Sequence, residues 1–243
     1  MKRSVKNLKE YTTETIHGEV GVVTEFYFDD ETLTVRYLLV ETGNWPFKRD
    51  ALIPVEAFAN FDWEKKHFSV NLMQEQILTS PKIDTAKPLS RQQENGLLNH
   101  YLGQNYWDTG NYSVGIWEPA GSAVVNGSGN KKSSTPASIR HQKDDIRLRS
   151  TQEVTGYHIY GIDGEAGVVE DFIVDDNTWK LHSIVVDTEC WLPGKKVMIP
   201  PQCINEINWE HSKVFLNMSI IAIKNSPEYD PSRVAVAAGE NPG

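Results

Sequence analysis

The chain has 243 residues, of which 39% are hydrophobic and 23% charged, a composition typical of a globular protein. Its net charge of −9 at pH 7 excludes nucleic acid from the expected partners, because a phosphate backbone attracts a basic surface. No segment reaches the roughly eighteen apolar residues of a membrane-spanning helix, and the basic N-terminus has no apolar run behind it. We therefore expect a cytoplasmic protein with Cys190 and Cys203 reduced, for which peripheral membrane association stays open.

The segment at residues 163–191 is similar in sequence to residues 17–45 and aligns with it without a gap, at a constant offset of 146. Twelve of the 29 aligned positions are identical, where chance would give roughly two. An offset of this length is far longer than a solenoid unit, so it indicates a duplicated domain with a connecting segment.

The first elements in each copy are predicted to be strands. Residues 21–28 and 33–40 are β-branched and aromatic runs, so they predict a hairpin. Asp29 and Asp30 lie at its tip and recur as Asp175 and Asp176, where side chains that bond the turn backbone are favoured over a metal site. Glycines flank the first strand of each hairpin, at Gly18, Gly21, Gly164 and Gly167. They favour a turn with positive φ over a phosphate-binding loop.

Later residues of each copy add a short strand (49–54 and 195–200) and a second hairpin (61–73 and 207–219). Both faces of the first strand are partly apolar, which favours a small closed or nearly closed barrel over a flat sheet. The expected fold class is therefore mainly β, with two tandem small β-barrels joined by a linker that contains a helix and is partly flexible.

The connecting segment begins with the signals of a helix. Ser90 and Gln93 fit an N-terminal capping box, and Gly103 fits a C-terminal stop. A Gly/Ser/Pro-rich stretch at 118–138 predicts flexibility. The expected domain boundaries are copy 1 at 1–85, a linker at 86–150 with a helix at about 90–102, copy 2 at 151–228, and a disordered tail at 229–243.

Three segments of copy 2 carry a family resemblance: DGEAGVVEDFIVDD at 163–176, VVDT at 185–188 and WLPGKKVMIP at 191–200. They resemble the PRC-barrel family, which includes the cytoplasmic barrel of the photosynthetic reaction-centre H subunit and the C-terminal domain of a ribosome maturation factor. The linker is similar to that of bacterial proteins with two such barrels, in a pattern matched by Pro88, Ser90, Arg91, Glu94, Tyr106 and Trp107. The resemblance covers roughly residues 4–107 and 150–227.

One loop departs from the family pattern differently in each copy. Copy 1 has Pro46-Phe47-Lys48-Arg49 in place of Leu-Pro-Gly-Lys, and copy 2 has Glu189-Cys190 in place of Gly-Asn. These loops are the candidate interaction sites, and they are not expected to bind identically. Their residues are Thr42, Gly43, Asn44 and Trp45 in copy 1 and Thr188, Trp191, Leu192, Pro193, Gly194 and Lys195 in copy 2. The two tryptophans could plug a barrel end, which is favoured, or offer a stacking surface.

No catalytic, metal-binding or phosphate-binding motif occurs in the chain, so no catalytic residue, metal ligand or cofactor is predicted. One acid–base set is conceivable in copy 2, formed by His158, Asp163, His182 and Asp187, but solvated surface residues are favoured. The sequence thus favours a protein that is not an enzyme.

The favoured function is a protein-interaction or adaptor module that docks onto a larger assembly, as the resemblance implies. The partner is expected to be a protein that the sequence does not identify, and strand edges favour a homodimer or higher oligomer. The alternatives are a peripheral accessory to reaction-centre electron transfer, and an enzyme or small-ligand binder with a site between the barrels.

Overall fold

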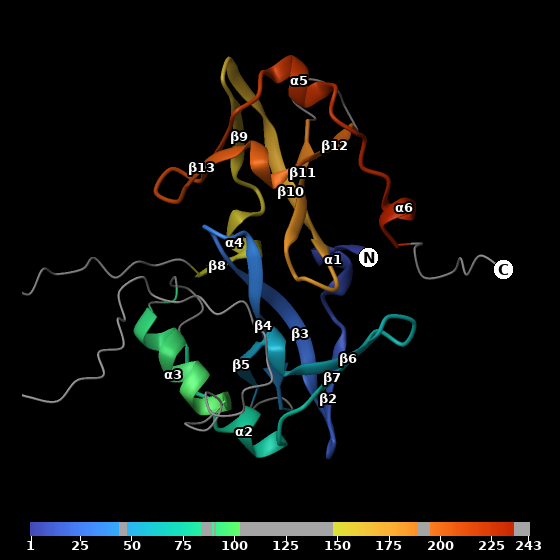
Figure 1. Cartoon of the computed structure of the whole chain (residues 1–243), viewed down its shortest axis with the longest axis vertical. Helices are drawn as coiled ribbons and strands as arrows, with labels where there is room; N and C mark the ends of the chain where they lie inside the picture. The colour runs from blue at the N-terminus through green and yellow to red at the C-terminus, as the bar shows by residue number, and fades with distance from the viewer. Residues whose placement is uncertain (44–47, 84–88, 90, 103–147, 189–194, 236–243) are drawn as a thin grey trace, which may run out of the picture.

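The computed structural model describes residues 1–43, 48–83, 89, 91–102, 148–188 and 195–235. Two curled sheets of seven strands follow one another along the long axis of the molecule (Figure 1). This arrangement confirms the predicted fold class, mainly β with two tandem barrel-like units. None of the helices in these ranges is long and apolar enough to cross a membrane.

Copy 1 forms the first sheet with the strand order β5-β4-β3-β2-β7-β6. Its elements are β2 (Thr12–Thr15), β3 (Gly18–Asp29), β4 (Thr34–Thr42), β5 (Arg49–Pro54), the 3-10 turn η1 (Val55–Ala57), β6 (Phe58–Asp62), β7 (His67–Val70), α2 (Gln74–Leu78) and α3 (Arg91–Leu102). β2 and β7 pair in parallel, which curls the sheet back on itself. The order ends at β5 and β6, which η1 connects, so the barrel is nearly closed.

Copy 2 repeats this order as β12-β11-β10-β9-β14-β13. Its elements are β9 (His158–Gly161), β10 (Gly164–Asp175), β11 (Leu181–Asp187), β12 (Lys196–Ile199), η2 (Pro201–Cys203), β13 (Ile204–Asn208), β14 (Lys213–Leu216), α5 (Ile220–Lys224) and α6 (Pro231–Ala235). The duplication seen in the sequence is therefore a duplication of the whole sheet.

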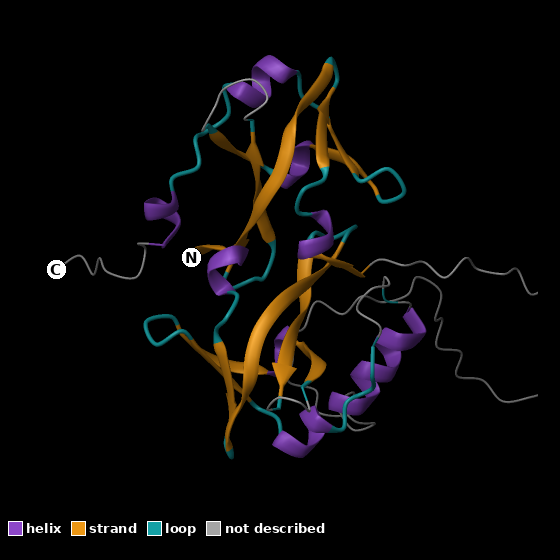
Figure 2. Ribbon diagram, turned by 180° about the vertical axis from the view of Figure 1, so that it is seen from behind, coloured by secondary structure: helices purple, strands orange, loops and turns teal. Residues whose placement is uncertain are grey.

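The seventh strand of each sheet comes from a segment that precedes the other copy. The first arm, β1 (Lys2–Ser4) with α1 (Val5–Leu8), precedes copy 1, but β1 pairs with β10 of copy 2. The second arm, β8 (Leu148–Ser150) with α4 (Thr151–Val154), precedes copy 2, but β8 pairs with β3 of copy 1. Figure 2 shows α1 and α4 side by side between the sheets. The two copies thus exchange their arms.

A single cluster of buried hydrophobic residues runs through both copies, and the rings of Phe28 and Phe172 lie 5.7 Å apart within it. The first aspartate of each tip accepts bonds from the turn, as predicted: Asp29 Oδ1 from the Thr32 amide at 2.7 Å, and Asp175 Oδ1 from the Thr178 amide at 3.0 Å. These bonds stabilise the ends of the long hairpins, where the copies meet.

The flanking glycines have two different causes. Gly18 and Gly164 have positive φ, 118° and 143°, as the sequence predicts. Gly21 and Gly167 are required by close packing, because a Cβ on either would lie 2.1 Å from a backbone oxygen of the next strand, and Gly167 has in addition a positive φ of 143°. The positive-φ explanation is thus insufficient for this second pair, whose absent side chains let β3 and β10 approach their neighbours.

Helix α3 occupies the segment for which the sequence predicts a helix, and it covers copy 1. Leu97 is buried in the core, and His100 Nε2 lies 2.7 Å from the Gln76 carbonyl oxygen of α2. The predicted caps, Ser90 and Gly103, and the predicted flexible stretch lie outside the described residues.

The C-terminal stretch for which the sequence predicts disorder contains α6 within its described part. The buried Val234 packs there against Ile173 and Val185 of copy 2. Just before this helix, the Tyr229 amide donates to the Lys196 carbonyl at 2.8 Å, which extends the edge of β12. Tertiary packing orders this segment although its sequence has no periodicity.

Candidate functional site

Each predicted interaction loop starts from a buried threonine. The Thr42 hydroxyl donates to the Arg49 carbonyl at 3.0 Å, and the Thr188 hydroxyl donates to the Lys195 carbonyl at 2.7 Å. Both threonines have no exposed area, so their side chains hold the loop base and do not face a partner. Gly43 is exposed and has a φ of 83°. The other loop residues, Asn44, Trp45, Trp191, Leu192, Pro193 and Gly194, lie outside the described residues.

A cation at the far side of each loop connects it to a short helix. Lys195 Nζ donates to the Lys224 carbonyl at the end of α5, at 2.6 Å. Arg49, at the equivalent position of copy 1, donates to the Leu78 carbonyl at the end of α2 and to the Ser80 carbonyl. Lys195, a predicted site residue, therefore fixes the loop to the helix, and Arg49 does the same although it was not predicted. Each loop begins and ends beside α2 or α5.

Exposed hydrophobic side chains gather at these same places. The described residues contain six large hydrophobic side chains that are exposed: Met1, Ile16, Met73, Leu78, Ile162 and Ile221. Five of them, all but Met1, lie in α2, at its N-cap, in α5, or in the hairpins β2–β3 and β9–β10. We call each such region an outer end, because the two regions lie at opposite extremes of the long axis (Figure 1).

Ile16 and Ile162 occupy the same position of the repeat, at the tip of their hairpins, and are 81% and 73% exposed. Polar residues dominate turns, so a large apolar side chain at both tips is unusual. The chain thus presents the same apolar group at each outer end.

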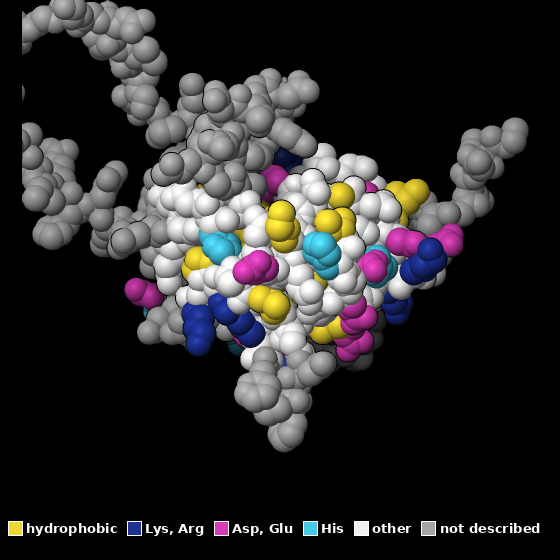
Figure 3. Space-filling view, turned by 90° about the horizontal axis from the view of Figure 1, so that it is seen from below, with side chains coloured by type: hydrophobic (Ala, Val, Ile, Leu, Met, Phe, Trp, Pro, Cys, Tyr) yellow, Lys and Arg dark blue, Asp and Glu magenta, His cyan; other side chains and the backbone are white. Residues whose placement is uncertain are grey.

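The surroundings of the two tips differ. In copy 2 the Ile162 amide donates to the Met218 carbonyl at 2.9 Å, and Asp163 Oδ1 accepts from the Ile220 amide at 2.7 Å. These bonds hold the tip against the start of α5. Copy 1 has His17 in the place of Asp163. Figure 3, which looks onto the outer end of copy 1, shows hydrophobic side chains interspersed with histidine and acidic ones.

The structure does not bring the residues of the conceivable acid–base set together. His158 and Asp187 both pair with Val168, from opposite sides, so two strand spacings of about 4.8 Å separate them. His158 Nδ1 instead lies 2.7 Å from Glu165 Oε1. Asp163 is engaged at α5, as described above. Among the described residues, no group of His, Cys, Asp and Glu side chains is placed to hold a metal ion.

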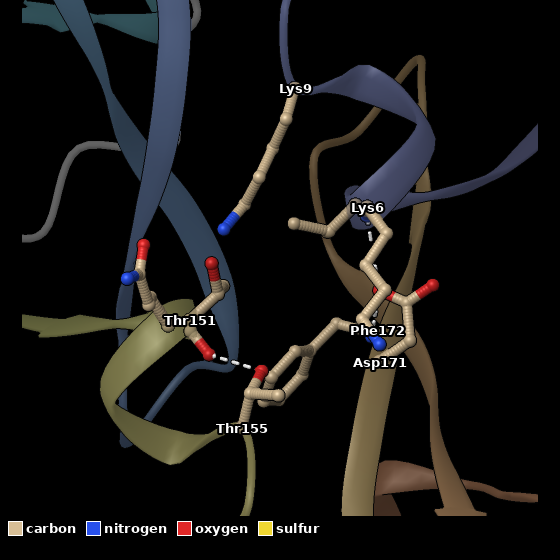
Figure 4. Close-up of a pocket in the computed structure, with 8 residues that line it drawn as sticks. Lys6, Lys9, Thr151, Thr155, Asp171 and Phe172 are labelled. Carbon is tan, nitrogen blue, oxygen red and sulfur yellow. Dashed lines mark hydrogen bonds between the residues drawn. The ribbon is translucent and has the colours of Figure 1, made fainter.

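A small pocket lies between the copies, where α1 faces α4 (Figure 4). Its volume is about 90 Å³, and Lys9 extends over it from the end of α1 toward the second arm. Asp171 is buried at its wall and accepts bonds from the Ser4 hydroxyl and the Lys6 amide. Burial raises the pKa of the Asp171 carboxyl above its usual range, against the lowering effect of these donors.

Sequence reasoning missed two arginines that join the copies. Arg3 Nε donates to Asp176 Oδ2 of copy 2 at 2.8 Å, while its guanidinium lies 3.7 Å from the ring centroid of Trp63 in copy 1. Arg149 forms the equivalent pair with Asp30 at 3.4 Å and the equivalent stack on Trp209 at 3.8 Å. The sequence did contain a sign that these two arginines are equivalent, because the dipeptide Arg-Ser at 3–4 recurs at 149–150 with the same offset of 146.

The PRC-barrel domain family matches residues 12–77 and 148–217, together more than half of the chain. A search of the curated proteins found no match. The two matched segments are the two sheets described above, the second with its arm. The chain therefore belongs to the PRC-barrel domain family, which it represents with two copies.

Proposed function

We propose that the protein is a non-enzymatic adaptor that binds protein partners through its two outer ends. PRC-barrel domains occur in many proteins, often in protein-interaction roles. The single observation that carries the proposal is the distribution of exposed hydrophobic side chains, five of six at the outer ends, with an isoleucine retained at the same tip position in both copies.

The shape of these ends supports binding to a surface and not to a small molecule. Each end combines a protruding hairpin tip, a short helix and the base of a predicted interaction loop, all anchored to a rigid sheet. Apolar side chains surrounded by polar ones are typical of protein-binding patches. Because the ends point in opposite directions, one molecule can connect two partners.

The alternative of a small-ligand site between the copies is less well supported. The pocket there has about 90 Å³, whereas ligand sites usually have roughly 300–1,000 Å³. A cavity of this size has room for a few water molecules only.

Self-association of the whole chain is part of the same proposal. β6 and β13 end their strand orders, and in the described part of the chain no strand pairs with their outer sides. Unpaired backbone groups at such edges can pair with a second molecule. A single species of 27.5 kDa at every concentration in sedimentation would contradict this part.

The experiment is affinity capture from the native lysate with the full-length protein and the variants Ile16→Asp and Ile162→Asp. Asn7→Asp, an exposed position on α1 that lies away from the outer ends and the strand edges, is the matched control for added charge. Losing a buried isoleucine from an interface costs about 1.5–3 kcal/mol, so capture of the true partner should fall roughly tenfold or more.

The partner should be retained by Asn7→Asp and lost from the tip variant whose end it occupies. If every captured protein binds the tip variants as well as the wild type, the outer ends are not the binding surface. Thermal unfolding of each variant verifies that the fold is intact.

A further inference from the structure

We propose that the contact between the two copies holds them together without a covalent connection, so that copy 2 is bound as a non-covalent partner of copy 1. We call this contact the seam; it consists of the hairpin tips around Thr34 and Lys180 and of the two exchanged arms. The covalent connection through residues 103–147 is then not needed to hold the copies together. This inference concerns the seam alone and does not depend on the outer ends.

The seam has the symmetry of a homodimer interface. At its centre Thr34 pairs with Lys180, the residue at the same position of the other copy. On either side the Val35 amide donates to the Trp179 carbonyl and the Leu181 amide donates to the Leu33 carbonyl, both at 2.8 Å. Equivalent groups thus exchange the same bond in both directions. This reciprocity defines the isologous contact of a two-fold dimer.

The exchanged arms are held by buried carboxylates at equivalent positions. The Ser4 hydroxyl donates to Asp171, and the Ser150 hydroxyl donates to Glu25. The Gln152 amide adds a bond of 2.9 Å to Glu25, and the Lys6 amide adds one of 3.1 Å to Asp171. Both carboxylates lie almost wholly inside the molecule. An arm that leaves would deprive a buried carboxylate of its donors, and this state is strongly unfavourable.

Aromatic packing across the seam resembles the anchors of a tight protein complex. Trp179 belongs to the hairpin tip of copy 2 and is only 7% exposed, because it packs against Phe61 and Phe26 of copy 1 at ring distances of 5.3 and 6.3 Å. Its φ of 57° is uncommon for a bulky residue, and Leu33 at the equivalent position has a φ of 50°. Buried tryptophan and arginine side chains at the centre of a contact dominate binding energy.

These features make each copy the natural partner of the other. Each sheet is complete only with the arm that precedes the other copy. Arg3 and Arg149 each contact both copies at once. A contact built in this way belongs with obligate interfaces and not with the loose contacts of tethered domains.

The test uses the full-length protein with a recognition sequence for a specific protease inserted between residues 118 and 138. After cleavage, native mass spectrometry and size-exclusion chromatography are run over a series of dilutions to nanomolar concentration. We expect one complex that contains both pieces in equal amounts and elutes with the uncut protein. Separation of the pieces at micromolar concentration would overturn the proposal.

The cleaved double variant Arg3→Ala/Arg149→Ala tests the assigned contacts. We expect its dissociation constant to rise at least roughly a hundredfold, about tenfold for each arginine, because the bonds from Arg3 to Asp176 and from Arg149 to Asp30 join the two pieces. Lys2→Ala/Gln152→Ala is the matched control, because both side chains are exposed on the same arms. Equal dissociation of the two double variants would refute the assignment.

Exchange of pieces is a readout that needs no variant. Isotope-labelled and unlabelled cleaved complexes are mixed, and mixed pairs are counted with time. Hybrids should form slowly, since both arms must detach first. Free pieces or hybrids at the moment of mixing would contradict a self-sufficient seam.

Discussion

Arg3 offers the sharpest test of how the arms are held, because a single substitution removes two contacts to different copies. Arg3→Ala deletes the bond to Asp176 and the stack on Trp63. The side chains of Arg3 and Asp176 are 10% and 6% exposed, so water replaces little of what is lost.

The magnitude follows from these two contacts. A hydrogen bond between charged groups contributes about 1.5–3 kcal/mol, and a desolvated cation–π contact contributes about 1–2 kcal/mol. We therefore expect Arg3→Ala to lower the free energy of unfolding by their sum, about 2.5–5 kcal/mol. For a chain of this size, this loss corresponds to a fall in Tm of roughly 10 °C. Asp176 keeps the Met1 ammonium as a partner, so the substitution does not leave its charge unpaired.

The assay is urea and thermal unfolding followed by circular dichroism. Arg36→Ala is the control, since its guanidinium is 33% exposed and lies 3.9 Å from Glu94, and such an exposed pair contributes at most about 1 kcal/mol. Arg3→Lys should fall between the two, because an ammonium keeps the charge but not the planar stack. If Arg3→Ala costs no more than Arg36→Ala, the arm is not held by these contacts.

Two further predictions concern close packing and pH. Gly167→Ala should destabilise the protein by more than about 3 kcal/mol, because its Cβ would lie 2.1 Å from the Asp187 oxygen and because its φ of 143° is unfavourable for a residue with a side chain. Gly96→Ala, in open space on α3, should stabilise the protein by about 0.5–1 kcal/mol. Equal urea midpoints for both variants would contradict this packing. Burial raises the pKa of Asp171, so protonation of this carboxyl favours the folded state. The free energy of unfolding of the wild type, compared with that of Asp171→Asn, should therefore be highest below the pKa of the unfolded chain, near about 4. It should fall as the pH rises through the pKa of the folded state. Unfolding in urea at pH 3 and pH 7 measures this difference, and a rise toward pH 7 would show that the pKa is lowered instead.

Several features could be predicted from the sequence because their causes are local. The hairpin tips followed from Asp29 and Asp175, whose side chains bond amides only two or three residues away. The helix over 91–102 followed from spacing and capping signals. The duplicated fold followed from the repeat itself, since similar sequences fold into similar sheets.

The outer ends were predicted only in part. The loops after β4 and β11 were identified, but Thr42 and Thr188 turned out to be buried, and the exposed Ile16 and Ile162 were not singled out. Exposure depends on which other segments cover a residue, and an isoleucine in a β-rich sequence is normally assigned to the core. The repeat of this isoleucine in both copies was the only signal available.

What the sequence by itself determined is the nature of the units: two mainly β copies, their hairpins, their turns and the family to which they belong. These properties arise from side-chain periodicity and from bonds between near neighbours. Only the tertiary structure decided that each arm completes the sheet of the other copy. A short strand such as Lys2–Ser4 can pair with any open edge, and the choice of β10 depends on Asp171, Asp176 and Trp63, which become neighbours only when the copies fold against one another.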